Sequence, residues 1–319
     1  MPSEEAQVWS ISSDDGQPLG WVKSHRQPVK LKTERAAITQ WGSQVGAPKI
    51  LTLLDESTLV LSHCQGQTSH TLSSSQATLL GETIATLHNI PYLDQDNLSL
   101  KEALNLREKN TLEQYPQVLS ILKCRAYDEL SMFQQMIDIL KQEDESDKEY
   151  DFMTRVPCHR DLKIDHLLFE SVTQHSSNKR GILNQKQVNS SFSKPVSSLN
   201  IIDWSQSRPD HWSSDWMHLL LDTQYRFESI NTAWLSYWTK RLLIQNSKLT
   251  PREIQRYAQE ILYGPFFKKR LCLHTLNTLT WGARHIGKSD QTVDIMLAIQ
   301  VWERGLKELQ QLKKFFLSE

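Results

Sequence analysis

The first sixty residues alternate between apolar and polar positions in the manner of short β-strands. Two such runs, Val8–Ser12 and Leu19–Val22, flank Asp14-Asp15-Gly16, a sequence typical of hairpin turns. A second pair, Pro48–Leu54 and Ser57–Leu61, is separated by only two acidic residues. The pattern therefore predicts two β-hairpins near the start of the chain.

Between the hairpins, apolar residues take the spacing of a helix from Thr33 to about Gln44. Thr33 would cap this helix, and Glu34 would lie in its first turn. The expected apolar face consists of Ala36, Ala37, Trp41 and Val45.

Helical spacing dominates from Ser73 onward. Seven segments are helix candidates: Ser75–Asn89, Leu98–Glu113, Tyr127–Gln142, Trp216–Ile230, Thr232–Asn246, Pro251–Leu273 and Asp290–Phe316. Strand character returns at Leu167–Phe169 and at Leu199–Asp203, on either side of the polar stretch Ser171–Ser198. We expect this stretch to be a flexible insertion, because it has too little apolar surface to order itself.

The composition is that of an ordinary globular protein and argues against several classes. The 319 residues include 36 basic and 37 acidic ones, and the formal charge of −1 argues against a protein that coats nucleic acid or anionic membranes. The four cysteines form no CxxC pair, which argues against a zinc ribbon. No signal peptide is visible, and no apolar run is long enough to span a bilayer. We therefore expect a cytoplasmic protein that binds neither nucleic acid nor membranes; the sequence does not indicate its oligomeric state.

Two segments combine carboxylates with short apolar strands. His159–Phe169 carries Asp161 and His166 in a polar loop, and Ile201–Trp204 ends an apolar strand with Asp203. A carboxylate at the end of an apolar strand is costly unless it meets a cation or a hydrogen-bond donor. If the two strands pair, these three side chains converge at one end of a hairpin. Such a cluster suits Mg²⁺ held against phosphates, with one carboxylate left to orient a nucleophile.

These segments resemble the aminoglycoside phosphotransferase family, small-molecule kinases of the protein-kinase-like superfamily. His159–Leu168 is similar to the family's catalytic loop, H-x-D-x-x-x-x-[N/H], and Ile201–Trp204 is similar to its metal-binding I-D-[WF]. Asp215 fits the downstream acidic residue of the same pattern. The first five residues of this loop, His159–Lys163, also match the protein-kinase string H-R-D-L-K. The short I-D-W motif and the helical C-terminal third favour the small-molecule branch.

Weaker similarities cover most of the remaining chain. Gly20–Lys23 is similar to the strand that bears the ATP-binding lysine, and Glu34 is placed like the helix glutamate that pairs with it. Leu59–Gly66 is similar to the hinge between two lobes, and Leu79–His88 to the helix that follows the hinge.

The resemblance implies a role for each of these residues. Asp161 would orient the proton of a substrate hydroxyl, and Asp203 would bind the Mg²⁺ that bridges the phosphates of ATP. His166 stands where an asparagine commonly holds a metal. Lys23, paired with Glu34, would contact the α- and β-phosphates. The other implied roles are Lys163 near the γ-phosphate, backbone groups near Ser62 and Cys64 at the adenine, and His159 and Asp215 as supports of the catalytic loop.

The implied fold is α+β, a two-lobed protein-kinase-like fold. A small β-rich N-lobe, possibly truncated at its start, would cover residues 1–66, and a larger, mainly helical C-lobe residues 67–319. Within the C-lobe we expect the catalytic loop at 159–168, the insertion at 171–198 and the metal-binding segment at 201–204. The implied activity is transfer of the γ-phosphoryl group of ATP, with Mg²⁺, to a hydroxyl of a small molecule. The acceptor is not indicated; Asp222, Glu228 and Glu303 would either meet a cationic acceptor or be surface charges.

A second interpretation stays open. No glycine-rich phosphate loop is visible, since the first glycine is Gly16, and a histidine occupies position 166. The first strand of the lobe is also missing, so either the true start lies upstream or the lobe is degenerate. The alternative is a catalytically inactive kinase-fold binding or scaffold protein. A kinase of protein substrates is disfavoured, because the 12 residues from Asp203 to Asp215 leave little room for an activation segment.

Overall fold

The N-terminal part of the protein is a four-stranded antiparallel sheet with the strand order β1-β2-β4-β3. The computed structural model describes residues 6–69, 71–92, 99–125, 127–142, 154–171, 196–221, 227–245, 248–286 and 292–316. The strands are β1 (Ala6–Ser12), β2 (Pro18–His25), β3 (Ile50–Asp55) and β4 (Thr58–Ser62). Both predicted hairpins are confirmed, and β2 extends far enough to include Lys23.

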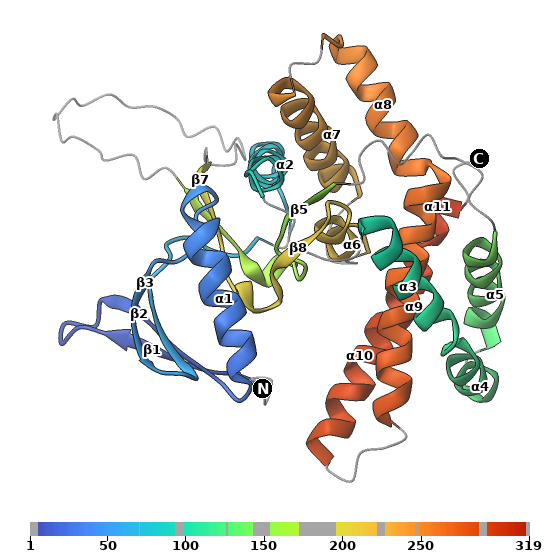
Figure 1. The fold of residues 1–319 in the computed structure, drawn as a ribbon, viewed down its shortest axis with the longest axis horizontal. Coiled ribbons are helices and arrows are strands. Elements are labelled where there is room, and N and C mark those ends of the chain that lie inside the picture. Colours follow the sequence, from blue (N-terminus) through green and yellow to red (C-terminus); the bar gives the residue numbers. More distant parts are fainter. Residues whose placement is uncertain are drawn as a thin grey trace, which may run out of the picture.

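Helix α1 (Pro28–Gln40) lies between the sheet and the rest of the molecule (Figure 1). It begins five residues earlier than predicted, because Pro28 occupies its first position, where the fixed φ of proline suits a helix. Thr33 is therefore not a cap but lies inside the helix, where its hydroxyl donates to the Val29 carbonyl oxygen. Glu34 lies in the second turn rather than the first, and Ala36 is exposed instead of buried. A separate 3₁₀ turn, η1, covers Gly42–Gln44.

Two short antiparallel strand pairs lie within the C-terminal part. β6 (Leu167–Ser171) pairs with β7 (Val196–Ile201), with Leu167 opposite Ile201, so the pairing on which the expected convergence depends is present. β5 (Arg155–Cys158) pairs with β8 (Arg208–His211), which the sequence analysis did not predict. Residues 172–195 of the predicted insertion lie outside the described residues.

Helices make up most of the remaining structure. They are α2 (Ser74–His88), α3 (Leu100–Leu112), α4 (Tyr115–Arg125), α5 (Tyr127–Lys141), α6 (Ser214–Leu221), α7 (Phe227–Ile244), α8 (Pro251–Tyr263), α9 (Pro265–Ile286), α10 (Thr292–Gln311) and α11 (Lys313–Phe316). Three expectations were wrong. α6 ends at Leu221 and α7 begins at Phe227, α4 was not predicted, and the segment Pro251–Leu273 is broken because Pro265 starts a new helix.

The core of the helical part is aromatic. Trp212, Trp216, Trp234, Trp238 and Phe267 are buried and contact one another. Figure 1 shows the resulting α+β, two-lobed arrangement, with the sheet and α1 (the N-lobe) on one side and the helices (the C-lobe) on the other. A search of the described helices for one long and apolar enough to cross a bilayer finds none.

The chain passes from the sheet to the C-lobe along residues 63–69. The His63 amide still donates to the Leu19 carbonyl oxygen, and Gln67 then forms a bridge with Phe169 of β6. The lobe division expected at residue 66 lies within this connection.

Candidate active site

Asp161 lies in the loop that links β5 to β6, and the buried side chain of Asp215 holds this loop. Asp215 accepts hydrogen bonds from the backbone N–H groups of His159 (3.0 Å) and Arg160 (2.5 Å), and His88 of α2 contacts the same carboxylate at 3.0 Å. Arg160 has a φ of 67°, a conformation that is unfavourable for arginine unless neighbouring contacts hold it. Asp215 therefore shapes the backbone immediately before Asp161.

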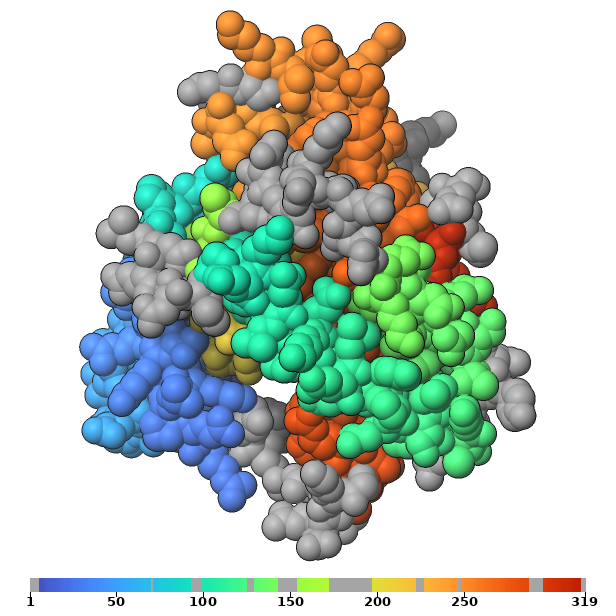
Figure 2. Space-filling view, turned by 45° about the vertical axis from the view of Figure 1, so that its right-hand side comes forward, coloured from blue at the N-terminus to red at the C-terminus, as the bar shows by residue number. Residues whose placement is uncertain are grey.

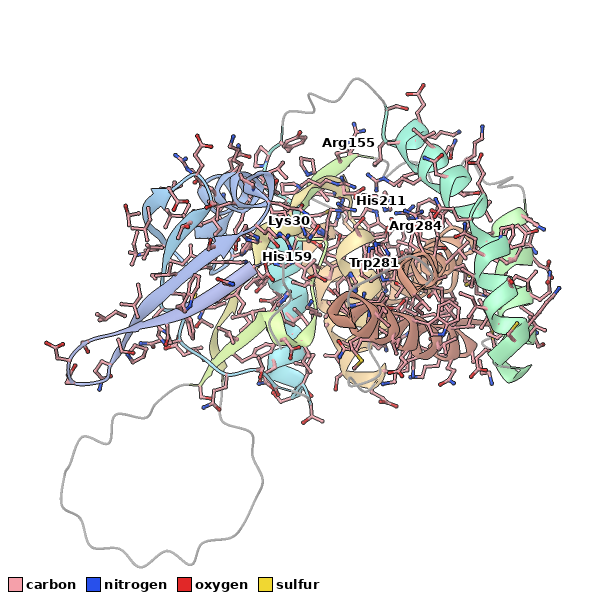
Figure 3. The ribbon with its side chains drawn as sticks, turned by 90° about the horizontal axis from the view of Figure 1, so that it is seen from below. Lys30, Arg155, His159, His211, Trp281 and Arg284 are labelled. Carbon is pink, nitrogen blue, oxygen red and sulfur yellow. The ribbon has the colours of Figure 1, made fainter. Side chains whose placement is uncertain are left out.

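His159 connects this loop to the segment that carries Asp203. Its Nε2–H donates to the Ile202 carbonyl oxygen at 2.9 Å, and its ring packs against Trp204 with 4.9 Å between the ring centroids. Figure 3 shows His159 where the N-lobe meets the helices of the C-lobe. The two motifs identified in the sequence thus lie side by side.

Asp161, His166 and Asp203 converge at the end of the β6–β7 hairpin. His166 donates from Nδ1 to the Asp161 carbonyl oxygen at 2.8 Å, so its Nε2 is an acceptor, 3.5 Å from Oδ2 of Asp203. Burial lowers the pKa of His166 more than the two nearby carboxylates raise it, so the imidazole is neutral at pH 7. The expectation that the three side chains meet is confirmed.

Lys23 of β2 connects the two lobes through one buried and one partly buried ion pair. Its Nζ lies 2.9 Å from Oε2 of Glu34 and 2.7 Å from Oδ1 of Asp203. Glu34 is fully buried and also contacts His25 at 3.1 Å. Burial alone would lower the pKa of Lys23, but the two carboxylates outweigh it and raise the pKa. Burial likewise opposes ionisation of Asp203, yet Lys23 and His166 hold its pKa far below the usual range. Lys23 and Asp203 are therefore both charged at pH 7.

The remaining predicted site residues lie around this centre. Lys163 contacts Oδ2 of Asp161 at 3.1 Å. Ser62 forms two hydrogen bonds with Lys49, the residue just before β3. The Ser62 N–H donates to the Lys49 carbonyl oxygen, and the Ser62 hydroxyl accepts from the Lys49 N–H, both at 2.8 Å. Cys64 is half-buried in the connection between the lobes, and burial raises the pKa of its thiol to about 11.

The donor set fits a divalent cation. One potential ligand atom from each of Asp161, His166 and Asp203 lies within 4.8 Å of the others. The unprotonated Nε2 of His166 faces a carboxylate oxygen of Asp203, and two acceptors in this position repel each other unless a cation lies between them. Carboxylate oxygens suit Mg²⁺, and a neutral imidazole is a possible additional ligand.

Comparisons with solved structures place this geometry in a known fold. A choline kinase from Cryptosporidium parvum Iowa II matches with a TM-score of 0.56 and 15% identity, over 99% of this chain and 88% of that one. Spectinomycin phosphotransferase, in complex with ADP and spectinomycin, matches with a TM-score of 0.54 and 12% identity, over 97% and 93%. An ethanolamine kinase from Plasmodium vivax matches with a TM-score of 0.51 and 12% identity, over 97% of this chain and 82% of that one. The chain has the fold of the small-molecule kinases. No family model matches it, and no curated protein matches it in sequence.

The small-molecule kinase fold brings two further side chains to the site that the sequence analysis did not propose. Trp21 lies two residues before Lys23 on β2 and so shares its face; its ring centroid is 6.4 Å from that of His63. The alternation of side chains along β2 could have identified Trp21, because it places this residue on the same face as Lys23. His218 of α6 lies 3.6 Å, through Nε2, from Oδ1 of Asp161. The sequence carried no signal for His218, because only the folding of α6 against the loop brings it there.

Proposed function

We propose that the protein transfers the γ-phosphoryl group of ATP to a hydroxyl group of a small molecule, with Mg²⁺ as cofactor. The observation that carries the proposal is the ion-pair chain Glu34–Lys23–Asp203, with Glu34 and Lys23 buried and Asp203 partly buried, which connects a cationic N-lobe strand to the cluster of Asp161 and His166. A protein that only needed a stable fold would gain little from charges buried in this way, because their desolvation offsets most of their attraction.

Each residue has a defined task in this reaction. Asp203 and His166 would hold Mg²⁺, which neutralises charge on the phosphates when bound. Lys23, oriented by Glu34, would attract the α- and β-phosphates as a point charge. Asp161 would accept the hydrogen bond of the acceptor hydroxyl and take its proton. The acceptor oxygen then bonds to the γ-phosphorus, the bond from that phosphorus to the bridging oxygen breaks, and ADP leaves.

The local surroundings of Asp161 suit this task. Lys163 and His218 contact its two carboxylate oxygens at 3.1 and 3.6 Å and so limit its rotation. Lys163 also places a positive charge where phosphate charge would develop. Catalysis would consist mainly of positioning and charge neutralisation. The residues 1–66 would supply the nucleotide-binding lobe, and an ATP-dependent reaction agrees with the cytoplasmic location expected from the sequence.

A thermal-shift comparison tests the proposal directly. A ligand that binds only the folded protein, at a hundred times its Kd, stabilises it by about 2.7 kcal/mol. We expect Mg²⁺-ATP to raise the melting temperature of the wild type by several degrees and to have little effect on Asp203→Asn. Asp161→Ala should keep the nucleotide shift but lose turnover, since it changes only the group that takes the proton. Nucleotide binding without turnover of any acceptor would instead favour a catalytically inactive binding protein.

A further inference from the structure

A cavity of about 450 Å³ lies between the Asp161 loop and helix α10. His218 lines this cavity and also contacts Asp161, at 3.6 Å, so a small molecule in the cavity would lie within reach of the proposed catalytic carboxylate. The other polar lining residues that matter here are Lys163, Glu303, Arg304, Lys307 and Glu308. In Figure 2 the surface is open between the N-lobe and the C-terminal helices. The cavity size suits a small metabolite.

Arg304 and Lys307 give one wall of the cavity its positive charge. They are three residues apart on α10 and so lie on the same face of the helix. Arg304 contacts the buried carboxylate of Glu308 through Nε, at 3.6 Å. Among the described residues, no partner contacts its two terminal amino groups or the ammonium of Lys307. Arg304 therefore presents a free, planar pair of donors, which matches a carboxylate or phosphate group.

His218 lines the cavity beside Asp161, and a second neutral histidine, His274, packs against His218. The rings of His218 and His274 pack edge to face, with 4.5 Å between their centroids, and His274 lies 3.8 Å from Glu308. Burial lowers the pKa of His218 to about 3, and Arg304 adds to this effect. Burial, His218 and Arg304 lower the pKa of His274 in the same way. Neutral imidazoles at this position can hydrogen-bond a hydroxyl group but add no positive charge that would attract an acid group.

We propose that the acceptor is a hydroxyl compound that also carries a carboxylate or phosphate group. Arg304 would bind the acid group through its two terminal nitrogens, Lys307 would add charge, and the hydroxyl would lie beside His218 and Asp161. No aromatic side chain lines the described part of this cavity, so cation–π recognition of a quaternary ammonium group has no basis there. The inference rests on the proposed phosphotransferase activity and adds its substrate class.

Glu303, considered from the sequence as a contact for a cationic acceptor, also lies at this cavity. It is exposed, as is Asp165 on the opposite side. The two carboxylates would bind an ammonium group if the acceptor carries one. Arg304 is exposed as well, at 46%, but the buried carboxylate of Glu308, 3.6 Å from its Nε, holds it at the cavity wall. Arg304 is therefore the stronger determinant of acceptor class, and the two arms of the test below separate these effects.

The test is a steady-state assay of ADP release from Mg²⁺-ATP with matched acceptors. Glycerate and glycerol 3-phosphate carry an acid group, glycerol carries none, and ethanolamine and choline are cations. We expect kcat/KM to be at least about tenfold higher for an acid-bearing compound than for glycerol. Comparison of glycerate with glycerol 3-phosphate distinguishes a carboxylate from a phosphate. Arg304→Gln should raise KM for that acceptor by about 10- to 100-fold, with KM for ATP unchanged.

Two control variants isolate the position and the sign of the charge. Arg256→Gln makes the same change on α8, where the side chain is 76% exposed and pairs only with Glu260 among the described residues. Glu303→Gln removes the opposite charge from the same cavity and should lower KM for the acid, because a carboxylate that repels it is lost. The inference is overturned if neither acid-bearing compound is phosphorylated, if glycerol or a cation is preferred, or if Arg304→Gln behaves like Arg256→Gln. A wild type with no nucleotide-dependent thermal shift would instead contradict the proposed function itself, and the inference with it.

Discussion

Trp9 and Trp21 lie on adjacent strands of the N-lobe sheet but on opposite faces. Trp21 pairs with Leu61 of β4 and lies on the same face of the sheet as Lys23. Trp9 pairs with Val22, so it lies on the other face. Trp21 is 38% exposed although its face is the one that meets the C-lobe, and Trp9 is 49% exposed. Similar exposure on opposite faces makes the pair a matched comparison for any ligand between the lobes.

We expect Trp21→Ala to raise the Kd of Mg²⁺-ATP by roughly 3- to 10-fold, because the base would lose an aromatic stacking partner worth about 1 kcal/mol. Trp9→Ala should leave the Kd unchanged. Isothermal titration measures both variants, and Mg²⁺-tripolyphosphate serves as a probe without a base, whose affinity Trp21→Ala should not alter. Equal losses for both probes would show that Trp21 acts through the structure of the sheet.

Asp203 illustrates how backbone conformation limits the choice of test variants. Its φ of 61° and ψ of 66° lie in the left-handed region, which asparagine tolerates and alanine does not. We expect Asp203→Ala to be about 1 kcal/mol less stable than Asp203→Asn in urea unfolding, since both remove the same charge next to Lys23. Equal stability of the two variants would contradict this account of the backbone.

At the scale of elements, the contact between α2 and α7 depends on one glycine. A Cβ added to Gly81 would lie 2.0 Å from the Ala233 carbonyl oxygen and 2.8 Å from the Tyr237 amide nitrogen, both backbone atoms of α7. α2 also supplies His88, which contacts Asp215 beneath the Asp161 loop. Any separation of the two helices would therefore disturb the catalytic loop as well.

We expect Gly81→Ala to destabilise the protein by about 2 kcal/mol or more, although alanine is the better helix former, because backbone atoms cannot move aside as a side chain can. Ser74→Ala, an exposed change in the first turn of the same helix, is the control and should stay within about 0.5 kcal/mol of the wild type. Urea unfolding followed by circular dichroism measures both. A stabilised Gly81→Ala variant would show that helix propensity outweighs the contact with α7.

The sequence predicted elements best where local signals agreed. The hairpins combined alternation with clear turn residues, and α2 had regular helical spacing; the structure adds a capping box at Ser73 before α2. The start of α1 was missed because Thr33 looked like a cap, while Pro28 marks the true first turn. α4 was not predicted, although Pro116 lies in its first turn, where proline is tolerated. β5 and β8 are only four residues each, too short for a periodic pattern.

In the site, too, local sequence motifs predicted some residues, whereas residues supplied by distant helices were not predicted. The convergence of Asp161, His166 and Asp203 followed from two motifs on neighbouring strands, since pairing of β6 with β7 fixes their ends. His218 and Arg304 could not be predicted, because they reach the loop from helices whose packing depends on the whole C-lobe.

At the scale of the whole molecule, Asp210 joins three parts of the C-lobe. This buried residue of β8 accepts from Nη1 of Arg107 on α3, at 2.9 Å to Oδ2, and lies 2.8 Å from Nε of Arg160 in the catalytic loop. Burial opposes its ionisation, but Arg160 and then Arg107 outweigh that effect and lower the pKa of Asp210 to about 2. The ionised form of this carboxylate is therefore favoured in the folded protein relative to the unfolded chain.

This shift predicts how stability depends on pH. A carboxyl group whose pKa is lower in the folded state stabilises the fold above its unfolded pKa, and that contribution is lost as the pH falls through the folded pKa. For Asp210 the window runs from its unfolded value of 3.8 down to about 2. We expect the free energy of unfolding of the wild type to exceed that of Asp210→Asn by several kcal/mol at pH 6, because the variant leaves Arg160 without its buried counter-charge. The difference should shrink by about 2 kcal/mol between pH 5 and pH 2.

Urea titrations at a series of pH values measure this difference in the free energy of unfolding, with Asp138→Asn, an exposed carboxyl on α5, as the control. A difference between wild type and Asp210→Asn that stays constant over this range would mean that the two arginines do not hold Asp210 ionised.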